Sequence, residues 1–210
     1  MQQRTPSEIE SESMRIIDSE AAGHHFSKQE WPVVRRMIHA TADFDFIQTI
    51  RFHPQALKNA LAALGRGCPI YADTGMLTSA IQKKAHDRFG CSITCLIGDA
   101  DIAHASAQSG ETRSVLAMRK AAPLLKAGII AIGNAPTALH EAINLYESGI
   151  LKPALIIGLP VGFVEARESK DRLFQSGITS ITNLDRKGGT PATAAALNAL
   201  LCLAESERPS

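Results

Sequence analysis

Short apolar runs recur along the chain after residue 68, and each is followed by a turn and then by apolar residues at helical spacing. The five runs occupy residues 69–72, 92–97, 129–132, 154–157 and 178–181. The helices after them are expected at residues 74–89, 112–126, 136–148, 163–175 and 191–203. Strands without polar alternation that alternate with helices indicate a parallel sheet buried on both faces. The pattern therefore predicts an α/β fold with three layers, α/β/α, around a five-stranded parallel sheet.

General rules of chain connection give the strand order and the remaining elements. Crossovers between parallel strands are right-handed, and we expect the flavodoxin-like order 2-1-3-4-5 rather than a Rossmann order. N-terminal helices precede the sheet and are predicted at residues 7–22, within 31–46 and at 54–64. Segment 99–109 is expected to be helical or irregular. Residues 1–210 should form one domain, with residues 1–6 and 206–210 flexible.

The stretch 31–46, WPVVRRMIHATADFDF, places a histidine between two charged residues on one helix face. The apolar side of this helix consists of Val33, Val34, Met37 and Ile38. Arg35 and His39 are four residues apart on the opposite side, and Asp43 continues their line if the helix extends that far. The arginine disfavours the imidazolium form of His39 and the aspartate favours it. The local sequence by itself favours an ordinary surface histidine.

Composition and charge argue against several classes of function. Basic and acidic residues nearly balance, 22 against 21, and aromatic residues make up only 5% of the chain, so no nucleic acid is expected as a partner. The polar start lacks the apolar region of a secretory signal, and no apolar run approaches the ~20 residues that a membrane helix needs. No contact with a membrane is therefore expected.

The cysteines give a prediction about the cellular compartment. They are Cys68, Cys91, Cys95 and Cys202, and they form no CxxC pair. Reduced, structural cysteines of this kind fit a cytoplasmic protein. The spacing of Cys91 and Cys95 is wrong for the usual closed zinc sites, so no metal site is predicted.

Glycine, hydroxyl and amide side chains follow the predicted strands where helices begin. In a parallel α/β sheet, ligands bind at the carboxyl ends of the strands, and the free N–H groups of helix N-termini favour anions. The residues concerned are Thr74, Arg113, Ser114, Asn134, Thr137, Gly162, Lys187, Gly188 and Gly189. Ordinary capping and turn formation explain any one of these loops. Taken together, with two cationic residues among them, the loops favour a large anionic ligand.

Motifs of other enzyme classes are absent from the sequence. There is no GxxxxGK[ST] or GxGxxG loop for nucleotide phosphates, no GxSxG elbow of α/β-hydrolases and no HExxH zinc motif. A nucleotide-binding domain is therefore disfavoured. In the first helix, Ser13 interrupts an apolar stripe, where it either bonds back to the chain or faces a ligand.

Seven segments resemble one known family, precorrin-8X methylmutase, also called cobalt-precorrin-8 methylmutase, of cobalamin biosynthesis. They run in order from residue 9 to residue 200: IESESMRIID (9–18), VVRRMIHATADFDF (33–46), DTGM (73–76), GETRSVLAM (110–118), AIGNAPTAL (131–139), PALIIGLPVGFVEARESK (153–170) and RKGGTPATAAALNAL (186–200). Together they are far more specific than any single loop.

The resemblance implies a flavodoxin-like homodimer with the active site near the dimer interface. It also implies an isomerisation in which a methyl group of a precorrin-8 macrocycle moves from C-11 to C-12 in a formal 1,5-sigmatropic shift. The product is hydrogenobyrinate, or cobyrinate when the substrate carries cobalt. The catalytic histidine of the family lies in the VVRRMIH segment, so that role carries over to His39.

Such a reaction makes no net redox change and uses no nucleophile, so no cofactor is expected, and any cobalt would travel with the substrate. The enzyme needs a proton donor or acceptor, assigned to His39, and groups that hold the carboxylates of the macrocycle. The expected substrate-binding residues are Ser13 and Arg35 together with the nine loop residues above. The alternative is a non-catalytic binding or carrier module for an anionic tetrapyrrole, which would not need His39.

Overall fold

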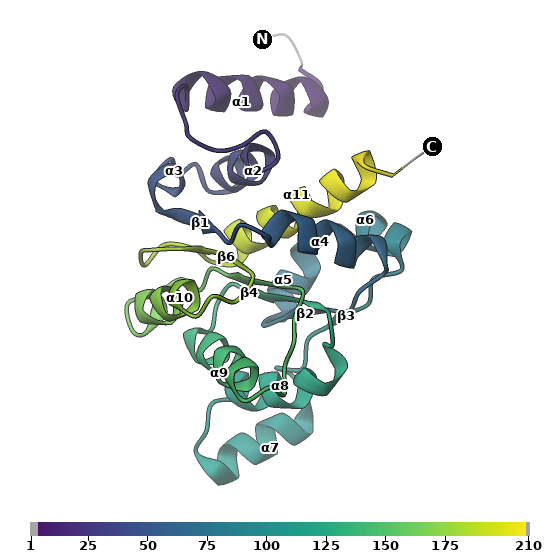
Figure 1. The fold of residues 1–210 in the computed structure, drawn as a ribbon, viewed down its shortest axis with the longest axis vertical. Coiled ribbons are helices and arrows are strands. Elements are labelled where there is room, and N and C mark those ends of the chain that lie inside the picture. Colours follow the sequence, from purple (N-terminus) through teal and green to yellow (C-terminus); the bar gives the residue numbers. More distant parts are fainter. Residues whose placement is uncertain (1–3, 209–210) are drawn as a thin grey trace.

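The centre of the molecule is a six-stranded sheet with helices on both faces (Figure 1). The structure is a computed structural model that describes residues 4–208. The strands are β1 (Ile50–Phe52), β2 (Ile70–Ala72), β3 (Ile93–Thr94), β4 (Ile129–Ile132), β5 (Leu155–Gly158) and β6 (Ser180–Asn183). Strands β2 and β4 to β6 are buried along their whole length. This burial on both faces is why the sequences of β2, β4 and β5 are apolar or small without alternation, while β6 buries the polar residues Thr182 and Asn183.

The sheet has the order β1-β6-β5-β4-β2-β3, so the predicted five-stranded, all-parallel sheet is wrong in its strand count and in its complete order. Strand β1 is the addition, and it pairs antiparallel with β6. It has three residues with Arg51 in the middle, so it gives no apolar run in the sequence. Without β1, the parallel strands lie in the order β3-β2-β4-β5-β6, which is the order 2-1-3-4-5 predicted for the five apolar runs.

Alternate residues of the central strands face two separate hydrophobic cores. On β4, Ile129 and Ala131 belong to one core, and Ile130 and Ile132 belong to the other. The first core is covered by α4 (Ala56–Gly65), α5 (Gly75–Ala80), α6 (Lys83–Phe89) and α11 (Thr190–Ser206). The second is covered by α8 (Arg113–Ala121), α9 (Pro136–Glu147) and α10 (Ala166–Gln175). The predicted covering of both sheet faces is therefore confirmed.

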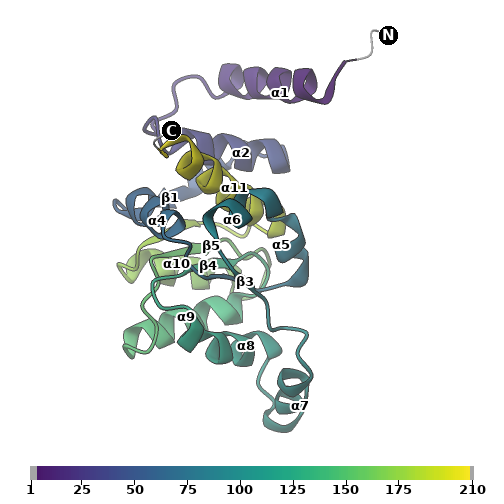
Figure 2. The same ribbon diagram turned by 90° about the vertical axis from the view of Figure 1, so that its right-hand side faces the viewer.

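Further helices extend the molecule beyond the three layers, as both views show (Figures 1 and 2). Helix α2 (Trp31–Thr41) packs on α11, and α1 (Pro6–Glu20) packs on α2. At the opposite end, α7 (Ala100–Ser109) packs on α8. Short elements complete the chain: α3 (Phe46–Thr49) and the 3₁₀ turn η1 (Ala122–Leu124).

Some predicted helix boundaries differ from the structure. The helix expected at 74–89 is two helices, because Ile81 is extended and α11 holds the break. Asn198 of α11 accepts the Gln82 N–H at 2.9 Å and donates to the Ala80 carbonyl at 3.0 Å. The helix expected from residue 163 begins at Ala166. These breaks depend on contacts with distant residues, which local periodicity does not record.

Residues 1–3 and 209–210 lie outside the described part of the chain, so the expected flexibility of 1–6 and 206–210 stays a prediction. Among residues 4–208, no helix has both the length and the apolar character needed to cross a membrane.

Candidate functional site

Helix α2 brings His39 to the end of the sheet where the parallel strands finish. The helix runs antiparallel to α11: Pro32 at its start lies near Leu203, and Asp43 just after its end binds Lys187, which precedes α11. Lys187 in turn follows β6. His39, in the last turn of α2, therefore lies on the side of the loops that follow the strands.

His39 and Ser13 line the same hollow, which has a volume of about 320 Å³. Its walls come from α1 and from the end of α2, and they consist of Ser13, Ile16, Ile17, Glu20, Ile38, His39, Ala42 and Phe44. The imidazole is exposed, and the hydroxyl of Ser13 donates to the Ile9 carbonyl at 2.8 Å. Two residues that were predicted from separate segments thus meet at one mostly apolar hollow with a titratable group at its wall.

The charged neighbours of His39 in the sequence are engaged elsewhere. Helix α2 ends at Thr41, because Ala42 has a left-handed conformation with φ 53°. Arg35 donates to a carboxylate oxygen of Asp18 at 2.8 Å, and Asp43 pairs with Lys187 at 2.8 Å. Arg35 also lines a different hollow, between α1, α2 and α11. The predicted line of Arg35 and His39 along the helix depended on a longer helix to reach Asp43, and α2 ends before it.

A buried carboxylate joins the loops after β2 and β4. Asp73 is only 1% exposed, and it accepts three backbone N–H groups, from Gly133 at 3.2 Å, Asn134 at 2.7 Å and Ala135 at 2.9 Å. Burial raises the pKa of Asp73, and the three amide donors act in the opposite direction. The amides before α9 that were predicted to bind an external anion already hold this internal one. The side chain of Asn134 remains exposed.

Next to Asp73, Thr74 serves as the cap of helix α5. Its hydroxyl oxygen accepts the Leu77 N–H at 3.2 Å. The predicted site residue therefore has the ordinary role that capping gives to a threonine at a helix start.

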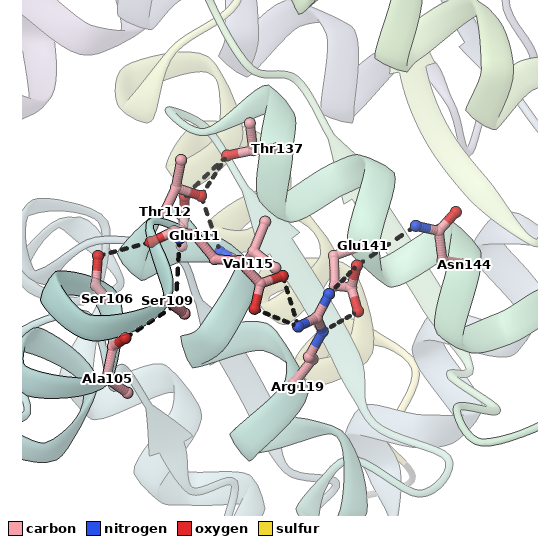
Figure 3. Close-up of polar contacts among 11 residues, drawn as sticks. Ala105, Ser106, Ser109, Glu111, Thr112, Val115, Arg119, Thr137, Glu141 and Asn144 are labelled. Carbon is pink, nitrogen blue, oxygen red and sulfur yellow. Dashed lines mark hydrogen bonds and ion pairs between the residues drawn. The ribbon is translucent and has the colours of Figure 1, made fainter.

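Hydroxyl groups from the starts of α8 and α9 form one cluster (Figure 3). Ser114 Oγ lies 2.9 Å from Thr137 Oγ1, and Thr112 Oγ1 lies 3.2 Å from Ser114 Oγ and 3.3 Å from Thr137 Oγ1. The neighbouring Arg113 is exposed, and its guanidinium has no hydrogen-bond or ion-pair partner among residues 4–208. Two helix N-termini and a free cation thus meet at one place, which is suited to a carboxylate ligand.

An ion-pair network behind the hydroxyl cluster fixes α8 against α9 (Figure 3). Arg119 of α8 donates to Glu141 of α9 at 2.6 Å and to Glu111 at 2.7 Å. Glu141 is buried and also accepts from Asn144 at 3.4 Å. This network sets the relative position of the two helix starts that carry Arg113 and Thr137.

The glycines of the loop between β6 and α11 allow it to touch the end of β5. A Cβ atom on Gly188 would lie 2.2 Å from the carbonyl oxygen of Leu159, and Gly188 has φ 148°. Gly189 N–H donates to the same carbonyl at 2.8 Å, and Gly162 N–H donates to the Arg186 carbonyl at 3.2 Å. These glycines bring two loops together, the one after β5 and the one after β6.

Lys187 pairs with two aspartates of the segment after α2. Its Nζ lies 2.8 Å from Asp43 and 2.5 Å from Asp45. Hydrogen bonds to these carboxylates raise the pKa of Lys187 above its usual range. The ammonium that was predicted to meet a ligand is therefore neutralised within the protein, where it ties the β6–α11 loop to the His39 helix.

One buried lysine was not singled out by the sequence. Lys170 of α10 is 0% exposed, and its Nζ donates to Asn183 Oδ1 at 3.1 Å and to the Lys187 carbonyl at 2.6 Å. Burial lowers the pKa of Lys170 to about 8. A lysine within a polar helix is normally expected at the surface, so no sequence signal pointed to it.

Comparisons with known proteins decide the family. The family model described as precorrin-8X methylmutase matches residues 8–203. The chain belongs to the precorrin-8X methylmutase family. Family members named cobalt-precorrin-8 methylmutase include one from Leptospira interrogans, 43% identical over 93% of this chain and 92% of its own length, and one from Priestia megaterium, 42% identical over 96% and 89%.

A solved family structure has the same fold. The precorrin-8X methylmutase from Thermus thermophilus superposes with a TM-score of 0.89 at 38% identity, over 94% of this chain and 96% of that one. Within residues 4–208, no three His, Cys, Asp or Glu side chains are placed to hold a metal ion together. The methylmutases are isomerases, and the hollow beside His39 is the natural candidate for their chemistry in this chain.

Proposed function

We propose that this protein catalyses the intramolecular migration of a methyl group from C-11 to C-12 of a precorrin-8 macrocycle, giving hydrogenobyrinate or cobyrinate in cobalamin biosynthesis. The observation that carries the proposal is the family match over residues 8–203. Relatives named as methylmutases at 42–43% identity over nearly the whole chain make a non-catalytic carrier the weaker reading.

His39 is the proposed proton donor or acceptor. Its support is its place at the wall of the hollow that it shares with Ser13, and its exposure to an incoming ligand. Protonation of a ring atom of the macrocycle favours the tautomer in which the methyl group migrates readily. General acid–base catalysis of this kind contributes about 10²–10⁴-fold to a rate.

The carboxylates of the macrocycle are proposed to bind at the hydroxyl cluster and at Arg113. The guanidinium is exposed without a protein partner in the described residues, and Ser114, the next residue along α8, contacts Thr137 of α9. Charge-assisted hydrogen bonds to carboxylates are about twice as strong as neutral ones. Several such anchors around a rigid ring would hold it in a fixed orientation relative to His39.

A homodimer in the cytoplasm is also proposed. Its support is a set of exposed apolar side chains in the segments that follow β2 and β5, among them Phe163 at 85%, Val164 at 79% and Met76 at 71% exposed. The four cysteines are free thiols, as a reducing compartment favours. Size-exclusion chromatography with light scattering tests the dimer, and a mass near 22.5 kDa would contradict it.

The proposed function is tested by the absorbance of the macrocycle on mixing with the protein. The wild type and His39→Ala are compared on metal-free and cobalt-containing precorrin-8, with His104→Ala, an exposed histidine on α7, as the matched control. We expect the His39→Ala rate to fall about 10²–10⁴-fold while the macrocycle still binds, and the control to keep wild-type activity. A wild type that turns over neither macrocycle would overturn the proposal.

A further inference from the structure

Lys170 is at the centre of a network that shapes the loop before α11. Asn183, which accepts from Lys170, is itself 0% exposed. Its Nδ2 donates to the Lys187 carbonyl at 2.9 Å and to Asp185. Asp185 also accepts the Lys187 N–H at 2.7 Å. The Lys187 carbonyl thus receives two buried donors, and segment 183–187 is folded around them.

The side chain of Lys187 makes contacts outside this network. Lys187 Nζ pairs with Asp43 and Asp45, which follow the helix that carries His39. Its backbone carbonyl is held by Lys170, and its side chain holds the segment that directly follows α2. A continuous set of contacts therefore leads from the buried ammonium of α10 to the segment directly after α2.

A buried ammonium is an unfavourable choice for stability alone. Taking a charged group out of water costs several kcal/mol, and an apolar side chain of similar length would fill the space at a lower cost. The lysine supplies two directed hydrogen bonds, which an apolar residue cannot make. These bonds hold the end of β6 and the loop between β6 and α11, and this loop contacts the segment after the His39 helix.

We propose that Lys170 is a positioning residue for the methyl migration: it holds the Lys187 carbonyl and thereby fixes, through Asp43 and Asp45, the end of the helix that carries His39. This inference rests on the proposed function for its effect on turnover, and on the geometry alone for its effect on His39. A displacement of about 1 Å in a reacting group is enough to cost 10²-fold in rate.

The experiment compares Lys170→Met, which keeps the length and removes the donors, with Leu173→Ala on the same helix. Leu173 is fully buried in the second core and is not a member of the loop network, so its variant controls for loss of stability. We expect Lys170→Met to lower kcat about 10–100-fold and Leu173→Ala to leave it within twofold. Lys170→Arg, which keeps a donor and a charge, should recover part of the loss.

Two further readouts separate positioning from general damage. In a His39→Ala background, Lys170→Met should lower kcat by less than twofold, because the residue acts through His39; a full 10–100-fold loss there would overturn the inference. In NMR spectra of protein with labelled histidine, the imidazole signals of His39, assigned with His39→Ala, should shift in Lys170→Met and stay in place in Leu173→Ala.

The NMR readout needs no substrate, so the two proposals fail separately. A wild type without turnover would contradict the function, and a shifted His39 signal would still support the link to Lys170. An unchanged His39 signal in a folded Lys170→Met protein would overturn the inference, whatever the activity.

Discussion

Replacing Lys170 by methionine should change how the stability of the protein depends on pH. The pKa of Lys170 is about 8 in the folded protein, against 10.5 for an ordinary lysine. Each unit of this difference corresponds to about 1.4 kcal/mol, so burial of the ammonium costs the folded state about 3 kcal/mol at neutral pH. The nearby carboxylates of Asp185 and Asp171 act in the opposite direction and leave the pKa lowered.

The sign follows from proton binding. Between pH 8 and 10.5 the unfolded chain holds a proton on Lys170 that the folded protein has released, so stability rises with pH in this window. This gain in stability is complete above pH 10.5, the pKa of the lysine in the unfolded chain, and it is lost as the pH falls to about 8. Between about pH 7 and about pH 9.5, the wild type should therefore gain ~2 kcal/mol in the free energy of unfolding relative to Lys170→Met.

Urea unfolding of both proteins at the two pH values, at one protein concentration, measures this difference. Other lysines titrate equally in the two proteins, so their effect cancels in the comparison. The difference in the free energy of unfolding between the wild type and Lys170→Met should change with pH. A change of less than ~0.5 kcal/mol between the two pH values would refute the reasoning, because the ammonium would then not be desolvated in the folded protein.

Further substitutions test other parts of the structure. Ala42→Gly should stabilise the protein by ~0.5 kcal/mol in urea unfolding, because relief of its left-handed conformation outweighs the added chain entropy; a loss of stability would contradict this. Arg119→Met should destabilise by ~2 kcal/mol, since it leaves buried Glu141 without its cation, and adding Glu141→Leu should recover most of the loss; additive losses would contradict the pairing. Arg113→Met should raise KM about 10-fold or more with little change in kcat, whereas Lys187→Met should chiefly lower kcat; an unchanged KM for Arg113→Met would remove it from the site.

The sequence predicted the central strands because burial on both faces leaves a continuous apolar run. Strand β4, IIAI, is buried at every position and was found from this feature alone. Strand β1 has the opposite character: its existence depends on the free edge of β6, about 130 residues away in the chain, and Arg51 interrupts its pattern. The break at Ile81 is likewise held by Asn198.

The candidate site was predicted from two kinds of signal: the resemblance to the family assigned the role of His39, and polar residues at helix starts or in an apolar stripe suggested the binding residues. His39 and Ser13 meet at one hollow, and Ser114 and Thr137 meet at two adjacent helix starts. The parts that were not predicted are pairings across the fold. No local pattern indicates that Asp73 occupies the amides before α9, or that a lysine of α10 lies under the next loop.

Arg35, Arg113 and Lys187 were all predicted to bind a ligand, but the structure shows that they differ in whether a carboxylate of the protein already pairs with them. A cation is available to a ligand only if no carboxylate of the protein already neutralises it, and that depends on which distant segments meet. Arg35 binds Asp18, and Lys187 binds Asp43 and Asp45, so each fastens one helix or loop to another. Arg113 keeps its charge free among the described residues, at the start of α8, where the start of α9 also lies. We therefore expect an anionic ligand to gain most at Arg113, whereas Arg35 and Lys187 tie α2 and the segment after it to other parts of the fold.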